Sequence, residues 1–150
     1  MEPYLQSHDS ARGRRASLST VLLVEEDDDL RSLLGQTLAD WKYEVLATSN
    51  AIKATDLWNL YRQHIGLVIT DVKMRGMNGP CLVELLIADN PDLKIIFISG
   101  GSSEKVQWLM AKYDQIMFLP KPFTIEDLAM TLNSVVSGRS NADDRRSTFF

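Results

Sequence analysis

The chain has 150 residues, of which 45% are hydrophobic and 24% charged, with a formal net charge of −4 at pH 7. This is typical of one globular domain with a substantial core, and the charge gives no reason to expect a nucleic-acid partner. The apolar runs are far shorter than the roughly 20 residues that span a bilayer, and the single cysteine, Cys81, excludes an internal disulfide and favours a reducing cytoplasm.

Two polar segments flank the predicted domain. Residues 1–19 are rich in Ser and Arg and lack an apolar period, so we expect a disordered leader. We expect a folded domain over residues 20–138 and a disordered tail over residues 139–150. The roughly one dozen residues of the tail are too few for an output domain. The chain is therefore expected to be either a stand-alone domain or a piece of a larger protein.

Between these segments, short apolar runs alternate with helical patterns. In chain order the sequence predicts strand 21–24, helix 30–41, strand 43–48, helix 51–63, strand 66–71, helix 81–90, strand 94–100, helix 103–112, strand 116–123 and a last helix up to Gly138. Five strand–helix units in strict alternation predict an α/β fold, with a doubly wound parallel sheet that is covered by helices on both faces.

Two of the predicted helices carry more detailed expectations. In helix 51–63 the apolar residues Ala54, Leu57, Leu60 and Tyr61 share one face. The last helix should begin with a capping box between Thr124 and Asp127 and end at Gly138. Its predicted inward residues are Ile125, Leu128, Leu132 and Val135.

Polar residues stand where the apolar runs end. These residues are Glu25, Glu26 and Asp27 after the first strand, Asp71 at the end of the third, Ser99 and Gly100 at the fourth, and Lys121 after the fifth. In open parallel sheets, sites form beyond the carboxyl ends of the strands. Clustered carboxylates require a cation, and all-oxygen ligands favour Mg²⁺. With a lysine and a hydroxyl nearby, this set indicates attack by an Asp oxygen on a phosphoryl donor, giving an aspartyl phosphate.

Each of these residues also has a simpler interpretation when taken alone. Acidic residues at 25–29 suit a solvated helix N-terminus, because they complement the helix dipole. Ser99 alone would be a strand-end hydroxyl, Lys121 a surface lysine and Phe118 a core residue. Only the coincidence of several such residues at one sheet edge favours a site.

Four segments resemble the signature segments of the receiver domain of two-component response regulators. They are VLLVEEDDDLRSLL, LVITDVKMRGMNG, IIFISGG and FLPKPF, and they occur in the family's order between about Val21 and Val136. The resemblance implies a five-stranded, flavodoxin-like sheet with strand order 2-1-3-4-5. It also implies a cis peptide bond between Lys121 and Pro122.

The resemblance assigns a role to each polar residue of the predicted site. It implies that Asp71 is the phosphoacceptor and that Lys121 pairs with the phosphoryl group. Ser99 and Gly100 would contact that group, with Ser99 as the switch hydroxyl. Phe118 would be the switch aromatic residue that turns inward with Ser99.

The same resemblance implies a Mg²⁺ site with three departures from the family pattern. The implied ligands are Glu25, Glu26, Asp71 and the backbone carbonyl of Lys73. Glu26 stands where the family usually has Asp, and its extra methylene moves the carboxylate outward. Lys73 is placed to pair with Glu26 or with the phosphoryl group, and should alter the lifetime of the phosphorylated state. Arg75 replaces a common proline and should loosen its loop.

The implied function is a phosphorelay signalling switch. Asp71 would receive the phosphoryl group, in a Mg²⁺-dependent reaction, from the phosphohistidine of a histidine kinase or a histidine phosphotransfer protein. The change would alter the face formed by helix 103–112, strand 116–123 and the last helix, for a downstream protein or for a homodimer. The domain would catalyse only its own phosphorylation and dephosphorylation.

Two alternatives remain beside the switch. One is a pseudo-receiver, an interaction module of the same fold that Glu26 and Lys73 prevent from taking phosphate. The other is a phosphatase of the haloacid-dehalogenase type. It is disfavoured, because Lys73 stands where those enzymes usually carry a second Asp.

Overall fold

A computed structural model of the chain describes residues 20–101 and 103–138. The predicted disordered leader and tail, residues 1–19 and 139–150, lie outside the described residues. The elements alternate along the chain as predicted, in the order β1 (Thr20–Val24), α3 (Asp28–Asp40), β2 (Glu44–Thr48), α4 (Ala51–Tyr61), β3 (Ile65–Asp71), α5 (Gly79–Asp89), β4 (Lys94–Ser99), α6 (Glu104–Lys112), β5 (Ile116–Pro120) and α7 (Ile125–Val136). Within the described ranges, no helix has the length and apolar character needed to cross a bilayer.

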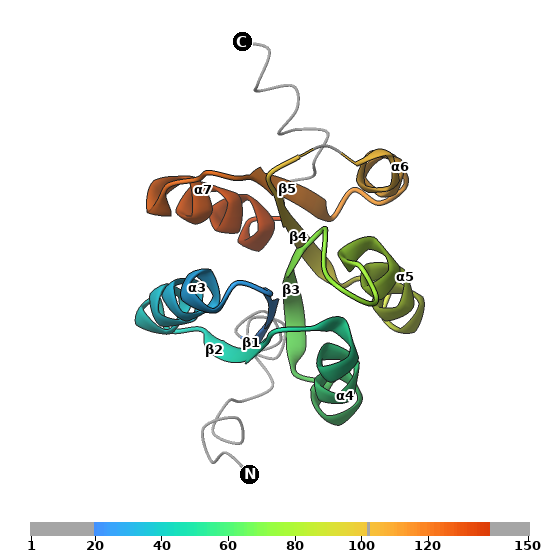
Figure 1. Cartoon of the computed structure of the whole chain (residues 1–150), viewed down its shortest axis with the longest axis horizontal. Coiled ribbons are helices and arrows are strands. Elements are labelled where there is room, and N and C mark those ends of the chain that lie inside the picture. Colours follow the sequence, from blue (N-terminus) through green and yellow to red (C-terminus); the bar gives the residue numbers. More distant parts are fainter. Residues whose placement is uncertain (1–19, 102, 139–150) are drawn as a thin grey trace.

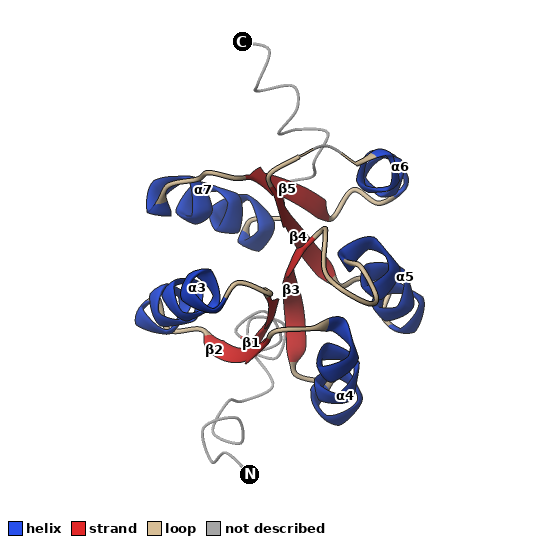
Figure 2. Ribbon diagram, viewed as in Figure 1, coloured by secondary structure: helices blue, strands red, loops and turns tan. Residues whose placement is uncertain are grey.

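The five strands form one parallel sheet in the order β2-β1-β3-β4-β5, which confirms the predicted topology. Helices α3 and α7 cover one face of the sheet, and α4, α5 and α6 cover the other (Figures 1 and 2). The order reverses between β1 and β3, so the loops that follow these two strands diverge to opposite faces. Such a switch point opens a crevice at the carboxyl end of the sheet.

The core consists of two apolar layers, one on each face of the sheet. In β4, Ile95 and Phe97 belong to the layer under α4, α5 and α6, whereas Ile96 and Ile98 belong to the layer under α3 and α7. This alternation follows from the two-residue period of a strand. Because both faces are covered, the central strands are continuous apolar runs, as the sequence predicted.

Side-chain caps set where the helices begin. The capping residues are Asp27, Asn50, Asn78, Ser103 and Thr124, and each accepts a hydrogen bond from a backbone N–H of the first turn. Thr124 and Asp127 form the predicted capping box. Gly138 follows α7 with a φ of 80°, a conformation that glycine adopts without a steric penalty, and it ends the helix as predicted.

The predicted apolar face of α4 is wrong in its second half. Leu60 is 73% exposed and Tyr61 is 38% exposed, whereas Trp58 is only 2% exposed. The buried stripe is Ala51, Ala54 and Trp58, which are spaced by three and four residues. The indole Nε1 of Trp58 donates a hydrogen bond of 2.7 Å to Asp89 at the end of α5, so its polar atom is satisfied although the ring is buried.

The predicted burial of α7 is confirmed except at its first residue. Leu128, Leu132 and Val135 are buried, but Ile125 is 39% exposed. Ile125 is the first residue after the cap, where the chain enters from the β5–α7 loop. It therefore lies at the edge of the contact between α7 and the sheet.

Candidate functional site

The predicted polar residues meet at the carboxyl end of the sheet. Asp71 is the last residue of β3, Glu25 follows β1, Ser99 ends β4 and Lys121 follows β5. These four residues line one pocket of about 470 Å³, together with Glu26, Asp27, Lys73, Ile98, Gly100 and Gly101. Glu25 is 1% exposed and Asp71 is 5% exposed, so their carboxyl groups form the floor of the pocket.

Lys121 joins the two buried carboxyl groups. Its Nζ lies 3.0 Å from Oδ1 of Asp71 and 3.5 Å from Oε1 of Glu25. Partial burial by itself lowers the pKa of Lys121. The hydrogen bond to Asp71 and the negative charges of Asp71 and Glu25 outweigh this effect, so the pKa of Lys121 is raised. Lys121 is thus a fixed ammonium cation at the pocket. The peptide bond from Lys121 to Pro122 is cis, as predicted.

Glu25 has an incompletely satisfied carboxyl group. Burial, and then the adjacent Asp71 carboxylate, raise the pKa of Glu25 from about 4.5 to about 7. Its Oε2 accepts a hydrogen bond of 2.9 Å from the backbone N–H of Asp27. Its Oε1 makes no hydrogen bond to any described residue, and its polar neighbour is the Lys121 ammonium group. A buried oxygen with a spare acceptor position is a suitable ligand for a cation.

The backbone and the side chain of Glu26 have different hydrogen-bond partners. Its backbone N–H donates to Oδ2 of Asp71 at 3.2 Å, which holds the second oxygen of that carboxylate. Its side chain lies against Arg75, whose Nε and backbone N–H both donate to Oε2, at 3.1 and 3.2 Å. These hydrogen bonds lower the pKa of Glu26, so its carboxyl group stays ionised at neutral pH.

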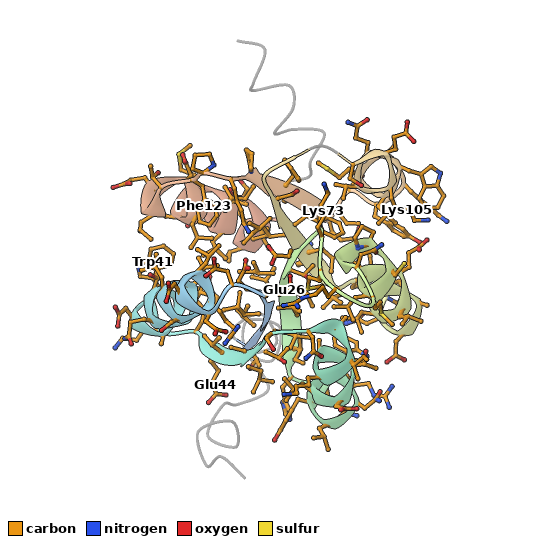
Figure 3. All side chains as sticks on the ribbon, viewed as in Figure 1. Glu26, Trp41, Glu44, Lys73, Lys105 and Phe123 are labelled. Atoms are coloured by element: carbon orange, nitrogen blue, oxygen red, sulfur yellow. The ribbon has the colours of Figure 1, made fainter. Side chains whose placement is uncertain are left out.

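The partner of Glu26 differs from one alternative for Lys73 and from the expectation for Arg75, while pairing of Lys73 with the phosphoryl group stays a prediction. Lys73 lines the pocket, but the cation bound to Glu26 is Arg75. Arg75 was expected to loosen this loop, whereas it ties the loop to the segment after β1. Figure 3 shows Glu26 and Lys73 between the two helical layers. No sequence signal selects Arg75 over Lys73 as the partner of Glu26, because both follow Asp71 closely in the sequence.

Gly79 fixes the far end of the same loop. Its backbone N–H donates to the carbonyl oxygen of Val72 at 2.9 Å. A Cβ at this position would overlap the carbonyl oxygen of Asp71. Only glycine therefore permits this close approach of α5 to the phosphoacceptor candidate.

Ser99 and Phe118 are connected by a second cavity. The Oγ of Ser99 accepts a hydrogen bond of 3.2 Å from the backbone N–H of Gly101. Phe118 is half-buried and lines an apolar cavity of about 270 Å³, with Val106 and Met110 among its other walls. Ser99 and Gly100 line both this cavity and the acidic pocket. Phe118 itself does not line the acidic pocket.

Two residues near the pocket have structural roles, and that of Asp27 agrees with the simpler interpretation of residues 25–29 as a helix N-terminus. Asp27 is the N-cap of α3, and its carboxylate accepts the backbone N–H of Leu30 at 3.0 Å. Arg31 donates from Nη1 to the carbonyl oxygen of Glu25 at 2.9 Å and pairs with Asp28. Arg31 thereby positions the backbone of Glu25. Residues three apart on a helix, such as Asp28 and Arg31, are neighbours on its surface, so this ion pair has a sequence signal, although it was not among the predictions, whereas the contact with Glu25 has none.

The donor set fits a hard cation, with two carboxylates in place. Glu25 and Asp71 are adjacent, and Oε1 of Glu25 has a free acceptor position. The third predicted carboxylate, Glu26, is bound to Arg75. Consistent with this, within residues 20–101 and 103–138 no three Asp, Glu, His or Cys side chains are arranged to hold a metal ion. Arg75 holds Oε2 of Glu26, so a third carboxylate ligand would require this side chain to turn toward Glu25 and Asp71.

The chain is similar to proteins of known family. The model of the response regulator receiver domain matches residues 21–133. Among curated proteins, the sensor kinase CckA of Brucella abortus (strain 2308) is 31% identical over 118 residues, which are 79% of this chain and 12% of that protein. The response regulator receiver protein CpdR of the same organism is 29% identical over 119 residues, covering 79% of this chain and 98% of that protein.

Solved structures agree with this likeness. The receiver domain of the hybrid histidine kinase CckA is 29% identical with a TM-score of 0.66, covering 77% of this chain and 97% of that one. Chemotaxis response regulator CheY4 of Vibrio cholerae is 25% identical, with a TM-score of 0.68 and the same coverage.

The match is to one domain of several longer relatives. This chain spans only 12% of the Brucella kinase and 25% of the transcriptional regulator NtrC of Azospirillum brasilense, which is 31% identical over 125 residues. The family model nevertheless covers most of this chain, and the sheet order is the one that receiver domains have. The chain therefore belongs to the family of response regulator receiver domains of two-component signalling.

Proposed function

We propose that this receiver domain is a phosphorelay switch in which Asp71 accepts a phosphoryl group. The proposed donor is the phosphohistidine of a histidine kinase or of a histidine phosphotransfer protein. The main supporting observation is that both oxygens of the Asp71 carboxylate are oriented, Oδ1 by Lys121 at 3.0 Å and Oδ2 by the backbone N–H of Glu26 at 3.2 Å. A carboxylate fixed at the floor of an open pocket is positioned for in-line attack.

In the proposed reaction, an oxygen of Asp71 attacks the phosphorus atom of the donor. The new bond is between that oxygen and phosphorus, and the bond that breaks joins phosphorus to the imidazole nitrogen of the donor. The electron pair of the broken bond stays on the imidazole. Lys121, which neutralises Asp71 before the reaction, is close enough to pair with the phosphoryl group afterwards.

The reaction is proposed to depend on Mg²⁺. Glu25, Asp71 and the backbone carbonyl of Lys73 would hold the ion, with Glu26 once it is free of Arg75. When bound, Mg²⁺ neutralises negative charge on the phosphoryl oxygens. Glu25 supports this proposal because its buried Oε1 makes no hydrogen bond to a described residue.

The output is proposed to follow from Ser99. Its hydroxyl and the backbone of Gly100 would contact the phosphoryl group, and Phe118 would turn inward along the cavity that it shares with Ser99. The face formed by α6, β5 and α7 would then change its affinity for a downstream protein or for a second copy of the domain. On this proposal, the domain catalyses only its own phosphorylation and dephosphorylation, in the cytoplasm.

A labelling assay tests this function. Acetyl phosphate carrying a radioactive phosphoryl group should label the parent protein with Mg²⁺ and not with a chelator. Asp71→Asn should lose the label. Asp92→Asn, which removes an exposed carboxylate beside the amino end of β4, should label like the parent. Equal labelling of Asp71→Asn and the parent would show that Asp71 is not the acceptor.

One observation favours the alternative of a pseudo-receiver. The Glu26 carboxylate is bound to Arg75 and does not join Glu25 and Asp71 in a three-carboxylate cluster. A domain that cannot recruit Glu26 would bind Mg²⁺ weakly and serve only as an interaction module. Amide NMR spectra that stay unchanged on addition of Mg²⁺ and a phosphoryl mimic would support this alternative.

A further inference from the structure

The contact between Glu26 and Arg75 links two loops of the acidic pocket. Arg75 donates two hydrogen bonds to a single carboxylate oxygen, one from its guanidinium group at 3.1 Å and one from its backbone at 3.2 Å. Glu26 belongs to the segment between β1 and α3, and Arg75 to the segment between β3 and α5. The contact therefore joins the two segments and holds one oxygen of a carboxylate that the proposed metal site would use.

The contact between Glu26 and Arg75 is exposed, and exposed ion pairs are weak enough to open. The Arg75 side chain is 93% exposed and that of Glu26 is 35% exposed, so water screens their attraction. The guanidinium group has a fixed array of donors and stays charged at any relevant pH. It neutralises the Glu26 carboxylate from outside the pocket, as a metal ion would from inside.

We propose that Arg75 is a latch that holds Glu26 away from the Mg²⁺ site and thereby sets the affinity of the domain for Mg²⁺. This inference rests on the proposed Mg²⁺-dependent function. The Glu26 carboxylate has two competing partners, Arg75 in the latched state and the metal ion in the released state. A ligand that binds only the released state shifts the population toward it. By reciprocity, Mg²⁺ binding frees the loop at Arg75.

The longer side chain at position 26 suits such a latch. Glu26 extends one methylene further than the Asp that usually stands there, which brings its Oε2 within hydrogen-bond distance of both donors of Arg75. Its backbone N–H stays on Asp71 at 3.2 Å. The side chain can therefore exchange partners while the backbone at the phosphoacceptor candidate stays in place.

The test measures Mg²⁺ affinity directly, by titration with Mg²⁺ followed in amide NMR spectra. Arg75→Gln should bind Mg²⁺ more tightly than the parent, by up to about fivefold, the largest change that an exposed ion pair supports. In the absence of metal, the amide signals of residues 75–78 in this variant should move toward their positions in the Mg²⁺-bound parent. Neither readout depends on phosphorylation.

Two controls separate a latch from a simple effect of charge. Lys73→Gln removes one positive charge from the pocket lining without touching the contact, so it should raise the affinity less than Arg75→Gln. In a Glu26→Gln background, the gain from Arg75→Gln should disappear, because the latch has already lost its acceptor charge. The latch would be overturned if Arg75→Gln still raised the Mg²⁺ affinity in the Glu26→Gln background, or if Lys73→Gln raised it as much as Arg75→Gln does.

The remaining outcomes also distinguish the latch from the proposed function. Unchanged or weaker Mg²⁺ binding by Arg75→Gln, in a parent that binds Mg²⁺ and is labelled at Asp71, would overturn the latch alone. Mg²⁺ binding by Arg75→Gln but not by the parent would support it. No binding by either protein would overturn both the latch and the proposed dependence on Mg²⁺.

Discussion

The Nζ of Lys121 lies 3.0 Å from the carboxylate of Asp71 and 3.5 Å from that of Glu25, so one ammonium group balances the two buried carboxyl groups. Removing that group leaves two buried carboxyl groups without a counter-charge. Lys121→Met should therefore lower the free energy of unfolding at pH 7 by about 1–3 kcal/mol. Urea unfolding followed by circular dichroism measures this.

Lys53→Met is the matched control for Lys121→Met, because Lys53 is exposed on α4. We expect its effect on stability to stay within about 0.5 kcal/mol. The loss in Lys121→Met should be smaller at pH 5, where Glu25 is protonated in the folded state. Equal losses in the two variants would contradict the counter-charge role of Lys121.

Glu25 should make the stability of the metal-free protein depend on pH. Its pKa of about 7 in the folded state lies above its ordinary value of about 4.5, so the folded protein binds more protons between these two values. The stabilisation is fully present below pH 4.5 and is lost as the pH rises through 7. Its size is on the order of 3 kcal/mol.

Glu25→Gln isolates this contribution, because it keeps the shape of the side chain and removes its titration. Unfolding is measured from pH 4.5 to pH 8 in a chelating buffer. The free energy of unfolding of the parent, minus that of Glu25→Gln, should fall as the pH rises. A difference that does not vary with pH would show that Glu25 titrates normally.

Replacing either of two glycines by alanine should have opposite effects on stability, because only Gly79 lies where α5 approaches Asp71 closely. In Gly79→Ala the new Cβ overlaps the carbonyl oxygen of Asp71, so we expect a loss of at least about 2 kcal/mol. In Gly35→Ala, within α3, no atom lies near the new Cβ, and we expect a gain of about 1 kcal/mol from helix propensity. Thermal unfolding compares the two. A neutral Gly79→Ala would refute the steric requirement.

The proposed switch predicts that the role of Ser99 in the conformational change can be separated experimentally from the role of Asp71 in phosphorylation. Ser99→Ala should still be labelled by acetyl phosphate within a few-fold of the parent rate, because Asp71 and Lys121 are unchanged. It should lose the phosphorylation-dependent shift of the Phe118 ring signals in NMR spectra. Ser134→Ala, within α7, should keep both properties. A Phe118 shift that survives in Ser99→Ala would show that another group drives the change.

The sheet and its polar edge could be predicted from the sequence for a physical reason. Strands buried on both faces are continuous apolar runs, and in a parallel sheet the polar residues that end them lie at one edge. Glu25, Asp71, Ser99 and Lys121 were placed together on this basis, and they line one pocket. Their roles in phosphoryl transfer stay predictions.

The partner of Glu26 and the buried face of α4 depend on contacts that a local pattern does not contain. Arg75 reaches Glu26 because of the loop path, which includes a φ of 79° at Gly76. In α4, apolar residues occupy most sides of the helix, so two stripes fit the helical period equally well. Which of the two stripes is buried depends on Trp58, whose N–H donates a hydrogen bond to Asp89 on α5, thirty-one positions away in the sequence.

The central claim is that Asp71 carries the phosphoryl group. Borohydride reduces an acyl phosphate to an alcohol, so trapping a phosphorylated sample and sequencing its peptides by mass spectrometry locates the modified side chain. We predict homoserine at position 71 after incubation with acetyl phosphate and Mg²⁺, and none when a chelator replaces Mg²⁺. Homoserine at another acidic position, or at no position in a sample that contains Mg²⁺, would contradict the account.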